Sequence, residues 1–332
     1  MDKKSVDKDI EAIENLPKLF ENIKNEIAKT IVGQIAVIDQ LLISLFARGH
    51  CLLIGVPGLA KTLLVKTLGE IMDLKFSRIQ FTPDLMPSDI TGTEIIEENV
   101  SSGKKEFKYI RGPIFANIIL ADEINRTPPK TQSALLEAMQ EYNVTAAGQT
   151  YELALPFFVL ATQNPIEQEG TYPLPEAQLD RFMFNLWLDY PSTNDEKTIV
   201  KQTTGADEIK SQKIVKHEEI LFYQDLMRKI PVADNVVDYA VKLVSATRPD
   251  GDEKFPYVKE WIRWGAGPRA SQYLVLAAKV RAGLLGKATP DLSDVKEMAL
   301  PVLRHRIVTS YNAEADNIFI GDIVNKLISD IG

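Results

Sequence analysis

The sequence is poor in the residues that crosslink chains or bind soft metals. It holds one cysteine, Cys51, and three histidines in 332 residues. A single cysteine excludes an internal disulfide framework, because a disulfide needs two thiols. So few cysteines and histidines also argue against a zinc site, which is normally built from several of them. Any bound metal is therefore expected to be Mg²⁺ held by oxygen ligands.

Long apolar runs and an excess of basic residues are missing as well. The longest apolar runs, such as residues 114–121, are too short to cross a bilayer, and the first residues lead into charge rather than into a signal-peptide core. We therefore expect a cytoplasmic protein without membrane insertion. The net charge is −8, whereas a general nucleic-acid binder needs a basic face to neutralise phosphates. Nucleic acid is accordingly not expected as the main partner.

What the sequence does contain is the alternation of strands and helices typical of an α/β fold. Short apolar runs are separated by stretches with apolar residues at helical spacing. Such alternation indicates parallel strands joined by crossover helices, so the first half is predicted to be a sandwich with helices on both faces of a sheet. The expected strands lie at residues 51–54, 75–81, 116–121 and 157–162, and the main expected helices at 36–47, 62–71 and 131–141.

The N-terminal segment and two insertions complete this first half. Residues 8–30 have helical spacing, and Pro17 is expected to break or kink the run, giving one or two helices. Alternating residues predict two β-hairpins, one at 94–109 with its turn at 101–103 and one at 143–153. Both hairpins are interpreted as insertions on the core.

After residue 190 the strand signals fade and helical patterns dominate. This change predicts two domains, an α/β domain at residues 1–190 and a smaller all-helical domain at residues 191–332. The expected helices of the second domain lie at residues 195–202, 218–230, 236–247, 271–285, 292–306 and 322–331.

The strongest chemical signal is a glycine loop between an apolar strand and a helix. Glycines let backbone N–H groups turn towards phosphate oxygens, and the following helix points its positive end at the same charge. Lys61 would then reach the β- and γ-phosphates of ATP, and the hydroxyl of Thr62 would bind Mg²⁺. The strict pattern has glycine directly before the lysine, whereas this chain has Ala60. The loop comprises Gly55, Val56, Pro57, Gly58, Leu59, Ala60, Lys61 and Thr62.

Two carboxylates end the apolar run at residues 116–121. A buried strand that ends in Asp122 and Glu123 is costly unless the charges are used. We expect Asp122 to hold Mg²⁺ through water beside Thr62, and Glu123 to orient or deprotonate the attacking water. The alternative is an acidic helix cap, which is a common feature. The phosphate loop upstream favours the catalytic interpretation.

A polar amide follows the run at residues 157–162. Asn164 could hydrogen-bond the γ-phosphate or the attacking water without competing for Mg²⁺, which is the task of a sensor. In isolation Asn164-Pro165 would be read as the start of a turn. Its position after the other two motifs makes Asn164 the favoured sensor.

Together these segments resemble the MoxR family of AAA+ ATPases. The resemblance rests on Asp122-Glu123-Ile124-Asn125-Arg126, on the sequence LPEAQLDRF at residues 174–182 and on Gly267-Pro268-Arg269. It covers nearly the whole chain. Members of this family commonly have alanine before the lysine, so Ala60 strengthens the family match while it weakens the general motif. The implied fold is an AAA+ P-loop αβα sandwich with a parallel sheet and hairpin insertions, followed by a smaller helical lid.

The resemblance also implies residues that complete the site. Arg181 would be an arginine finger that reaches the ATP of a neighbouring subunit, Arg269 would be a second sensor of the γ-phosphate, and Arg126 is a further interface candidate. For Arg181 and Arg269 the alternative is a surface salt bridge. A finger acting in trans requires a head-to-tail oligomer, and the family implies a hexameric ring. The implied nucleotide contacts are Val32, Gly33 and Gln34 beside the adenine, loop residues 55–62, and Leu63.

The implied activity is ATP hydrolysis that drives remodelling or maturation of protein clients, often proteins with a von Willebrand factor A domain. Two alternatives share the ATPase core. A DNA-dependent motor akin to the minichromosome-maintenance helicases is disfavoured by the acidic balance, and a metal-chelatase motor subunit would be favoured by co-purification with a chelatase partner.

Overall fold

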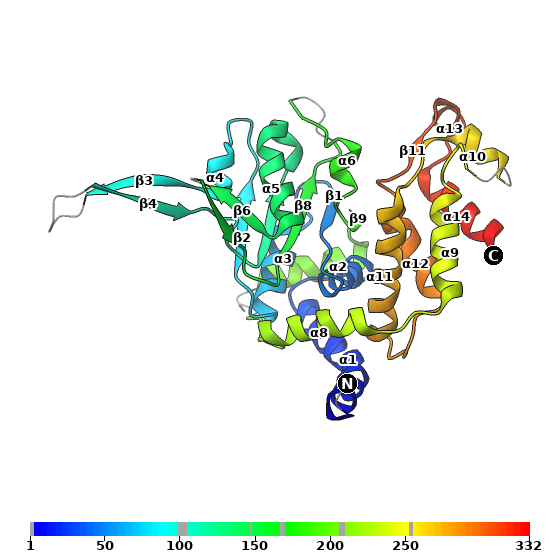
Figure 1. The fold of residues 1–332 in the computed structure, drawn as a ribbon, viewed down its shortest axis with the longest axis horizontal. Helices are drawn as coiled ribbons and strands as arrows, with labels where there is room; N and C mark the ends of the chain where they lie inside the picture. Colours follow the sequence, from blue (N-terminus) through cyan, green and yellow to red (C-terminus); the bar gives the residue numbers. More distant parts are fainter. Residues whose placement is uncertain (1–2, 99–104, 147, 167–169, 206–209, 252–254) are drawn as a thin grey trace.

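The computed structural model describes residues 3–98, 105–146, 148–166, 170–205, 210–251 and 255–332. Figure 1 shows an α/β body with most of the C-terminal helices packed on one side and a long hairpin projecting from the other. The predicted hairpin turn at residues 101–103 falls outside the described residues. No helix in the described part of the chain is both long and apolar enough to span a membrane.

A five-stranded parallel sheet forms the centre of the body, as predicted. Its strand order is β2-β5-β8-β1-β9, and because all strands are parallel, their carboxyl ends meet at one edge. The edge strand β9 is an addition to the four strands expected from the sequence. The strands are β1 (Cys51–Gly55), β2 (Phe76–Gln80), β5 (Ile118–Asp122), β8 (Phe158–Gln163) and β9 (Phe184–Leu188).

Helices cover both faces of this sheet. Because alternate residues of a strand face opposite sides, the residues of β5 show which helices lie on each face. Along β5, Ile118 and Leu120 join an apolar cluster with α1, α2 and α3, whereas Ile119 and Ala121 join a second cluster with α5. The αβα sandwich is therefore confirmed. The helices of this part are α1 (Lys3–Ala28), α2 (Ile35–Phe46), α3 (Lys61–Ile71), α4 (Pro87–Thr91), α5 (Pro129–Glu141) and α6 (Glu176–Leu179), with a 3₁₀ turn at Ile124–Arg126.

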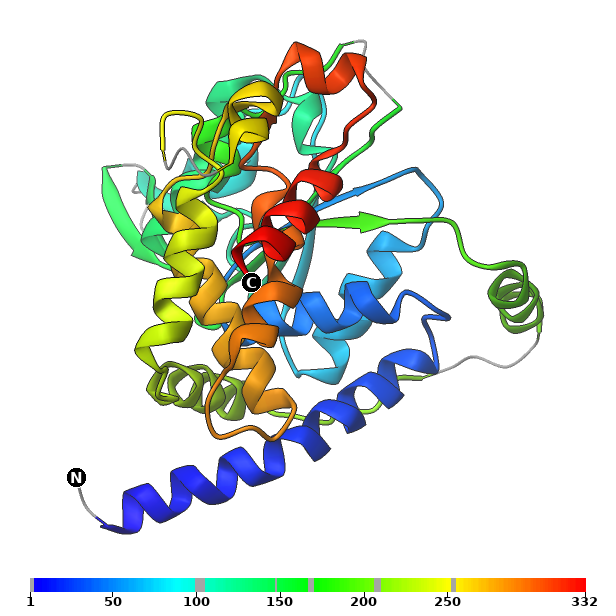
Figure 2. The ribbon, with the colours of Figure 1, turned by 90° about the vertical axis from the view of Figure 1, so that its right-hand side faces the viewer.

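The N-terminal segment forms one helix, α1, and not two (Figure 2). Pro17 lies inside it, although a proline removes one backbone hydrogen bond from a helix. Four apolar side chains of α1 are buried in the core, namely Leu16, Phe20, Ile23 and Ile27. Their burial offsets the cost of the proline, because each such side chain contributes roughly 1.5–3 kcal/mol.

Both predicted hairpins are present, and they contact each other. The rings of Tyr109 and Tyr151 stack with their centroids 4.4 Å apart, which joins the base of the long hairpin to the short one. Further out, Ile96 and Phe107 lie opposite each other across the long hairpin and are 61% and 74% exposed. The long hairpin consists of β3 (Gly92–Glu98) and β4 (Lys105–Arg111), and the short one of β6 (Asn143–Ala146) and β7 (Gln149–Glu152).

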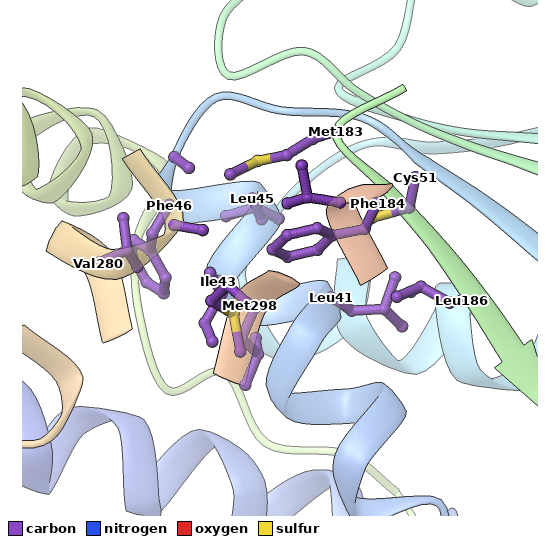
Figure 3. Close-up of a cluster of buried hydrophobic side chains, with 14 of the residues drawn as sticks. Leu41, Ile43, Leu45, Phe46, Cys51, Met183, Phe184, Leu186, Val280 and Met298 are labelled. Carbon is purple, nitrogen blue, oxygen red and sulfur yellow. The ribbon is translucent and has the colours of Figure 1, made fainter. Parts of the chain in front are cut away.

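The part after β9 is helical apart from one short antiparallel ribbon. Its helices α11 and α12 pack on the body through an apolar cluster that includes Phe184 of β9, Val280 and Met298 (Figure 3). The predicted boundary at residue 190 stays a prediction. The elements are α7 (Thr193–Thr203), α8 (His217–Lys229), α9 (Asp234–Ser245), α10 (Pro256–Trp261), β10 (Ile262–Trp264), α11 (Pro268–Leu284), α12 (Leu292–Leu303), β11 (Val308–Thr309), α13 (Tyr311–Ala315) and α14 (Ile320–Ile331).

Candidate nucleotide site

Two residues with left-handed backbone shape the loop between β1 and α3. Gly58 has a φ of 88° and Ala60 a φ of 54°. Glycine adopts this conformation readily, whereas alanine does so at a cost of about 1 kcal/mol. Ala60 immediately precedes α3, so its conformation sets the direction in which the free N–H groups of the first helical turn point. The predicted strand–loop–helix arrangement is present.

The side chain of Lys61 reaches back to the first residue of this loop. Its ammonium group donates to the backbone carbonyl of Gly55. Burial lowers the pKa of Lys61, and the negative charges of Asp122 and Glu123 oppose that shift. The loop and the end of β5 therefore lie close enough for their charges to interact. Thr62, the next residue of α3, is half-buried.

Asp122 is the last residue of β5, and both of its carboxylate oxygens are engaged. Oδ1 accepts a hydrogen bond from the hydroxyl of Thr162 at 2.7 Å. Oδ2 accepts two hydrogen bonds from the guanidinium of Arg78, from Nε at 3.1 Å and from the terminal nitrogen at 2.7 Å. These partners come from β8 and β2, the two neighbours of β5 in the sheet. Sequence reasoning missed both of them.

Glu123 follows directly and has a left-handed backbone with a φ of 58°. Its N–H donates to the hydroxyl of Thr162 at 2.9 Å, so one hydroxyl bridges the two acidic residues. Its Oε2 accepts a hydrogen bond from the amide of Gln80 at 3.0 Å and lies 3.2 Å from Nε of Arg126. Arg126, considered above as an interface arginine, thus lies beside Glu123 of its own chain.

Asn164 lies one residue beyond β8, at the same edge of the sheet as Asp122. It is 7% exposed. Its Oδ1 accepts a hydrogen bond from the N–H of Ile166 at 3.2 Å, which closes a local turn. Asn164 therefore lies in a turn at the end of β8, and its role as a sensor stays a prediction.

The segment expected beside the adenine lies close to the phosphate loop. The side-chain amide of Gln34 donates to the carbonyl of Asp189 at 2.8 Å, and Asp189 directly follows Leu188, the sheet partner of Gly55. The other predicted contacts, Val32, Gly33 and Leu63, are half-buried or exposed.

Arg181 and Arg269 lie at the opposite edge of the sheet. The backbone register pairs Cys51 with Phe184, three residues after Arg181, so Arg181 lies near the amino-terminal ends of the strands. The phosphate loop begins at the carboxyl-terminal end of β1, after Gly55. At about 3.3 Å per residue, the strand between them spans roughly 13 Å. The structure therefore brings the loop, Asp122, Glu123 and Asn164 together but not the two predicted arginines.

A cleft of about 650 Å³ opens at this second edge, and both arginines line it. Arg269 also pairs with Asp180 at 3.1 Å, so the salt-bridge alternative holds for Arg269 in this conformation. Two further arginines, Arg48 and Arg228, line the cleft, and the described lining residues include no Asp or Glu. Arg48 pairs with Asp225 at 2.6 Å, so two of the four arginines already have a carboxylate partner.

The loop and β5 offer hard oxygen donors to a metal ion. Among the described residues, no three His, Cys, Asp or Glu side chains converge as a metal site. Thr62 supplies one hydroxyl, and the carboxylate of Asp122, whose oxygens accept from Thr162 and Arg78, can reach an ion through water. This small donor set fits Mg²⁺, which usually takes one or two protein ligands and completes its shell with phosphates and water.

Comparisons with known proteins agree with this geometry. Residues 50–184 match the ATPase family associated with various cellular activities (AAA), and residues 257–327 match the AAA lid domain. Chaperone MoxR1 of Mycobacterium tuberculosis is 44% identical over 306 residues, covering 92% of this chain and 80% of the relative. The uncharacterized protein YeaC of Bacillus subtilis is 40% identical over 319 residues, 96% of each chain. A crystal structure from Cytophaga hutchinsonii, of a protein provisionally described as an ATPase, has 42% identity and a TM-score of 0.89, covering 100% of this chain and 99% of that one.

Proposed function

This chain belongs to the MoxR family of AAA+ ATPases, and on that premise we propose that it couples hydrolysis of ATP with Mg²⁺ to the remodelling of protein partners. It is an ATPase with a chaperone-like role. The grouping of Lys61, Asp122 and Glu123 at one edge of the sheet is the observation that carries the hydrolytic part of the proposal.

Each group at this edge has one task in the proposed reaction. Lys61 neutralises charge on the β- and γ-phosphates, and Glu123 orients or deprotonates the attacking water. Asn164 donates its amide to the γ-phosphate or to that water. Thr62 would hold Mg²⁺ directly and Asp122 through water, and the ion would supply positive charge to the phosphate oxygens. Thr162 and Gln80 fix the carboxylates of Asp122 and Glu123 through the hydrogen bonds described above.

The two arginines are proposed to act on the nucleotide of a neighbouring subunit. Arg181 is separated from its own phosphate loop by the length of β1, about 13 Å, and Arg269 shares its cleft. A head-to-tail contact would bring the cleft of one copy over the loop of the next, where planar guanidinium groups fit phosphate oxygens. Both arginines are therefore assigned to the same site in trans.

Such head-to-tail contacts close into a ring, which we propose to be a hexamer. The clients are proposed to be proteins, including partners with a von Willebrand factor A domain, and the location to be the cytoplasm. The chaperone name of the Mycobacterium tuberculosis relative supports the protein clients. We also propose residues 1–190 as the nucleotide-binding domain and residues 191–332 as the lid.

Mixing two inactive variants tests the proposal. Glu123→Gln should retain ATP binding and lose roughly 10²–10⁴-fold in turnover, and Arg181→Ala should lose roughly 10³-fold or more. Mixed oligomers should regain turnover, because an intact Arg181 on one chain completes the intact site of the other. Recovery is read as phosphate release after subunit exchange has been verified by a labelled chain.

The controls are exposed residues of the same types, Glu137→Gln and Arg263→Ala, which should leave turnover unchanged. Normal hydrolysis by Glu123→Gln would remove this residue from the reaction. Absence of recovery despite subunit exchange would show that Arg181 does not act in trans.

A further inference from the structure

The backbone around Arg181 is bound by side chains from the C-terminal helical part. Each of the four consecutive backbone carbonyls of residues 180–183 accepts a hydrogen bond from a side chain of this helical part. Arg306 donates to the carbonyls of residues 180, 182 and 183, at 2.9, 2.6 and 3.3 Å. Tyr273 donates its hydroxyl to the carbonyl of Arg181 at 3.1 Å, and Nε2 of His305 lies 2.9 Å from the carbonyl of Phe182.

Arg306 is the centre of this arrangement. Its Nε donates to Oδ1 of Asp180 at 2.7 Å, and its side chain is only 2% exposed. The guanidinium lies 5.2 Å from the centre of the Tyr273 ring, which joins the two donors. A buried arginine needs a carboxylate and hydrogen-bond acceptors to be stable. Apart from the carbonyl of Val302 in α12, the acceptors here belong to the segment that carries Arg181.

The same segment buries Phe182 and Met183 in the two apolar clusters of the body, but it has fewer hydrogen bonds to the sheet and to α5. The guanidinium of Arg181 donates to the carbonyl of Leu136 in α5 at 2.8 Å. The N–H of Met183 donates to the carbonyl of His50 at 2.7 Å. A short segment without long secondary structure is held in one geometry only when its surroundings fix it. Most of the bonds that fix these carbonyls come from Arg306, Tyr273 and His305.

We propose that Arg306 is a positioning residue for the arginine finger, so that the C-terminal helical part sets where Arg181 meets the neighbouring nucleotide. The inference rests on the proposed function, because it requires Arg181 to act in trans. Arg306 does not itself touch substrate in this proposal. It acts through the carbonyls of residues 180–183 and through Asp180.

A purely structural role for Arg306 predicts a different result from a positioning role. If Arg306 only held the fold together, its loss would damage both the chain's own ATP site and its finger. A positioning role predicts that the chain keeps a competent ATP site and loses only the finger that it offers to its neighbour. Mixed oligomers separate these two outcomes.

The test uses Arg306→Lys and Arg306→Met in the full chain. Lysine can retain the pair with Asp180 but cannot reproduce the planar set of donors to three carbonyls. Both variants should bind ATP as the wild type does and lose at least about 10-fold in turnover, since a finger is worth roughly 10³–10⁵-fold. Mixed with Glu123→Gln, they should regain turnover. Mixed with Arg181→Ala, they should not, because neither chain then supplies a working finger.

The matched control is Arg281→Lys, because Arg281 is also an ion-paired arginine of the helical part, with buried Asp294 as its partner. It should keep normal turnover. Tyr273→Phe serves as a milder variant that removes only the hydroxyl on the Arg181 carbonyl, and it should lower turnover several-fold with the same mixing behaviour. This variant decides the question if both Arg306 variants fail to fold.

Four results would overturn the inference. Folded Arg306 variants with normal turnover would do so, and so would Tyr273→Phe with normal turnover if the Arg306 variants do not fold. Recovery on mixing with Arg181→Ala, but not with Glu123→Gln, would place the effect of Arg306 in its own ATP site. No recovery with either partner, despite subunit exchange, would show that Arg306 has a purely structural role. The proposed function fails separately, through normal turnover of Arg181→Ala itself.

Discussion

His50 is a buried histidine whose two ring nitrogens are both fixed by backbone groups. Its Nδ1 accepts a hydrogen bond from the N–H of Val159 at 3.1 Å, and its Nε2 lies 3.0 Å from the carbonyl of Met139. Only the neutral ring with the proton on Nε2 satisfies both partners, because a charged ring would turn a second N–H towards a donor. Burial lowers the pKa of His50 to about 4. The fold therefore keeps this ring neutral at a pH where the unfolded chain protonates it.

The expected loss of stability follows from the two pKa values. Histidine in an unfolded chain titrates near 6.5. Between that value and about 4 the unfolded state binds more protons than the folded state, so the free energy of unfolding falls as the pH falls. Each unit by which the pH falls in this window lowers the free energy of unfolding by about 1.4 kcal/mol. Acidification from pH 7.5 to 5.0 should therefore cost about 2 kcal/mol through His50 alone.

The measurement compares the wild type with His50→Gln, which cannot be protonated and can still donate to the Met139 carbonyl. Urea unfolding followed by circular dichroism at pH 7.5 and 5.0 gives the loss of unfolding free energy for each protein. The wild type should lose about 2 kcal/mol more than the variant. His305, whose pKa burial also lowers, titrates in both proteins and cancels from the comparison. Equal losses in both proteins would refute the reasoning from burial.

Two further changes probe the site and the packing near it. Thr162→Val keeps the shape of the side chain but removes the hydroxyl that bridges Asp122 and Glu123. Turnover should fall at least about 10-fold, because misplaced catalytic groups slow a reaction strongly. ATP binding, measured by fluorescent-nucleotide titration, should persist. Gly49→Ala would place its Cβ 2.4 Å from Sδ and 2.7 Å from Cβ of Met183; it should lower the unfolding free energy by about 1–3 kcal/mol, and an unchanged urea midpoint would contradict the packing described.

The elements that the sequence predicts well are those whose pattern is local. Four strands are apolar runs bounded by glycine, proline or charge, and their positions in the structure agree within two residues. β9 was missed because its sequence, FNLWL, places the polar residue Asn185 inside an otherwise apolar run, although the structure buries this side chain. The continuity of α1 through Pro17 was not predictable either, since it depends on burial against distant helices.

The candidate site also has a part that local sequence predicts and a part that it does not. The phosphate loop and the pair Asp122-Glu123 are contiguous in sequence, so their chemistry can be read directly. The partners Arg78, Gln80 and Thr162 lie about 40 residues from these carboxylates, and their contacts depend on which strands are neighbours and in what register. A single sequence holds no local signal for that order.

The stack of Tyr109 on Tyr151 gives the long hairpin mechanical character. A two-stranded ribbon is marginally stable in water without further contacts, and here its base is secured by this stack and by the bond from the Tyr109 hydroxyl to the Thr91 carbonyl. A seven-residue strand is about 23 Å long. A small rotation at the base would therefore displace the exposed side chains of Ile96 and Phe107 further than the residues at the base, because the displacement grows with distance along the ribbon.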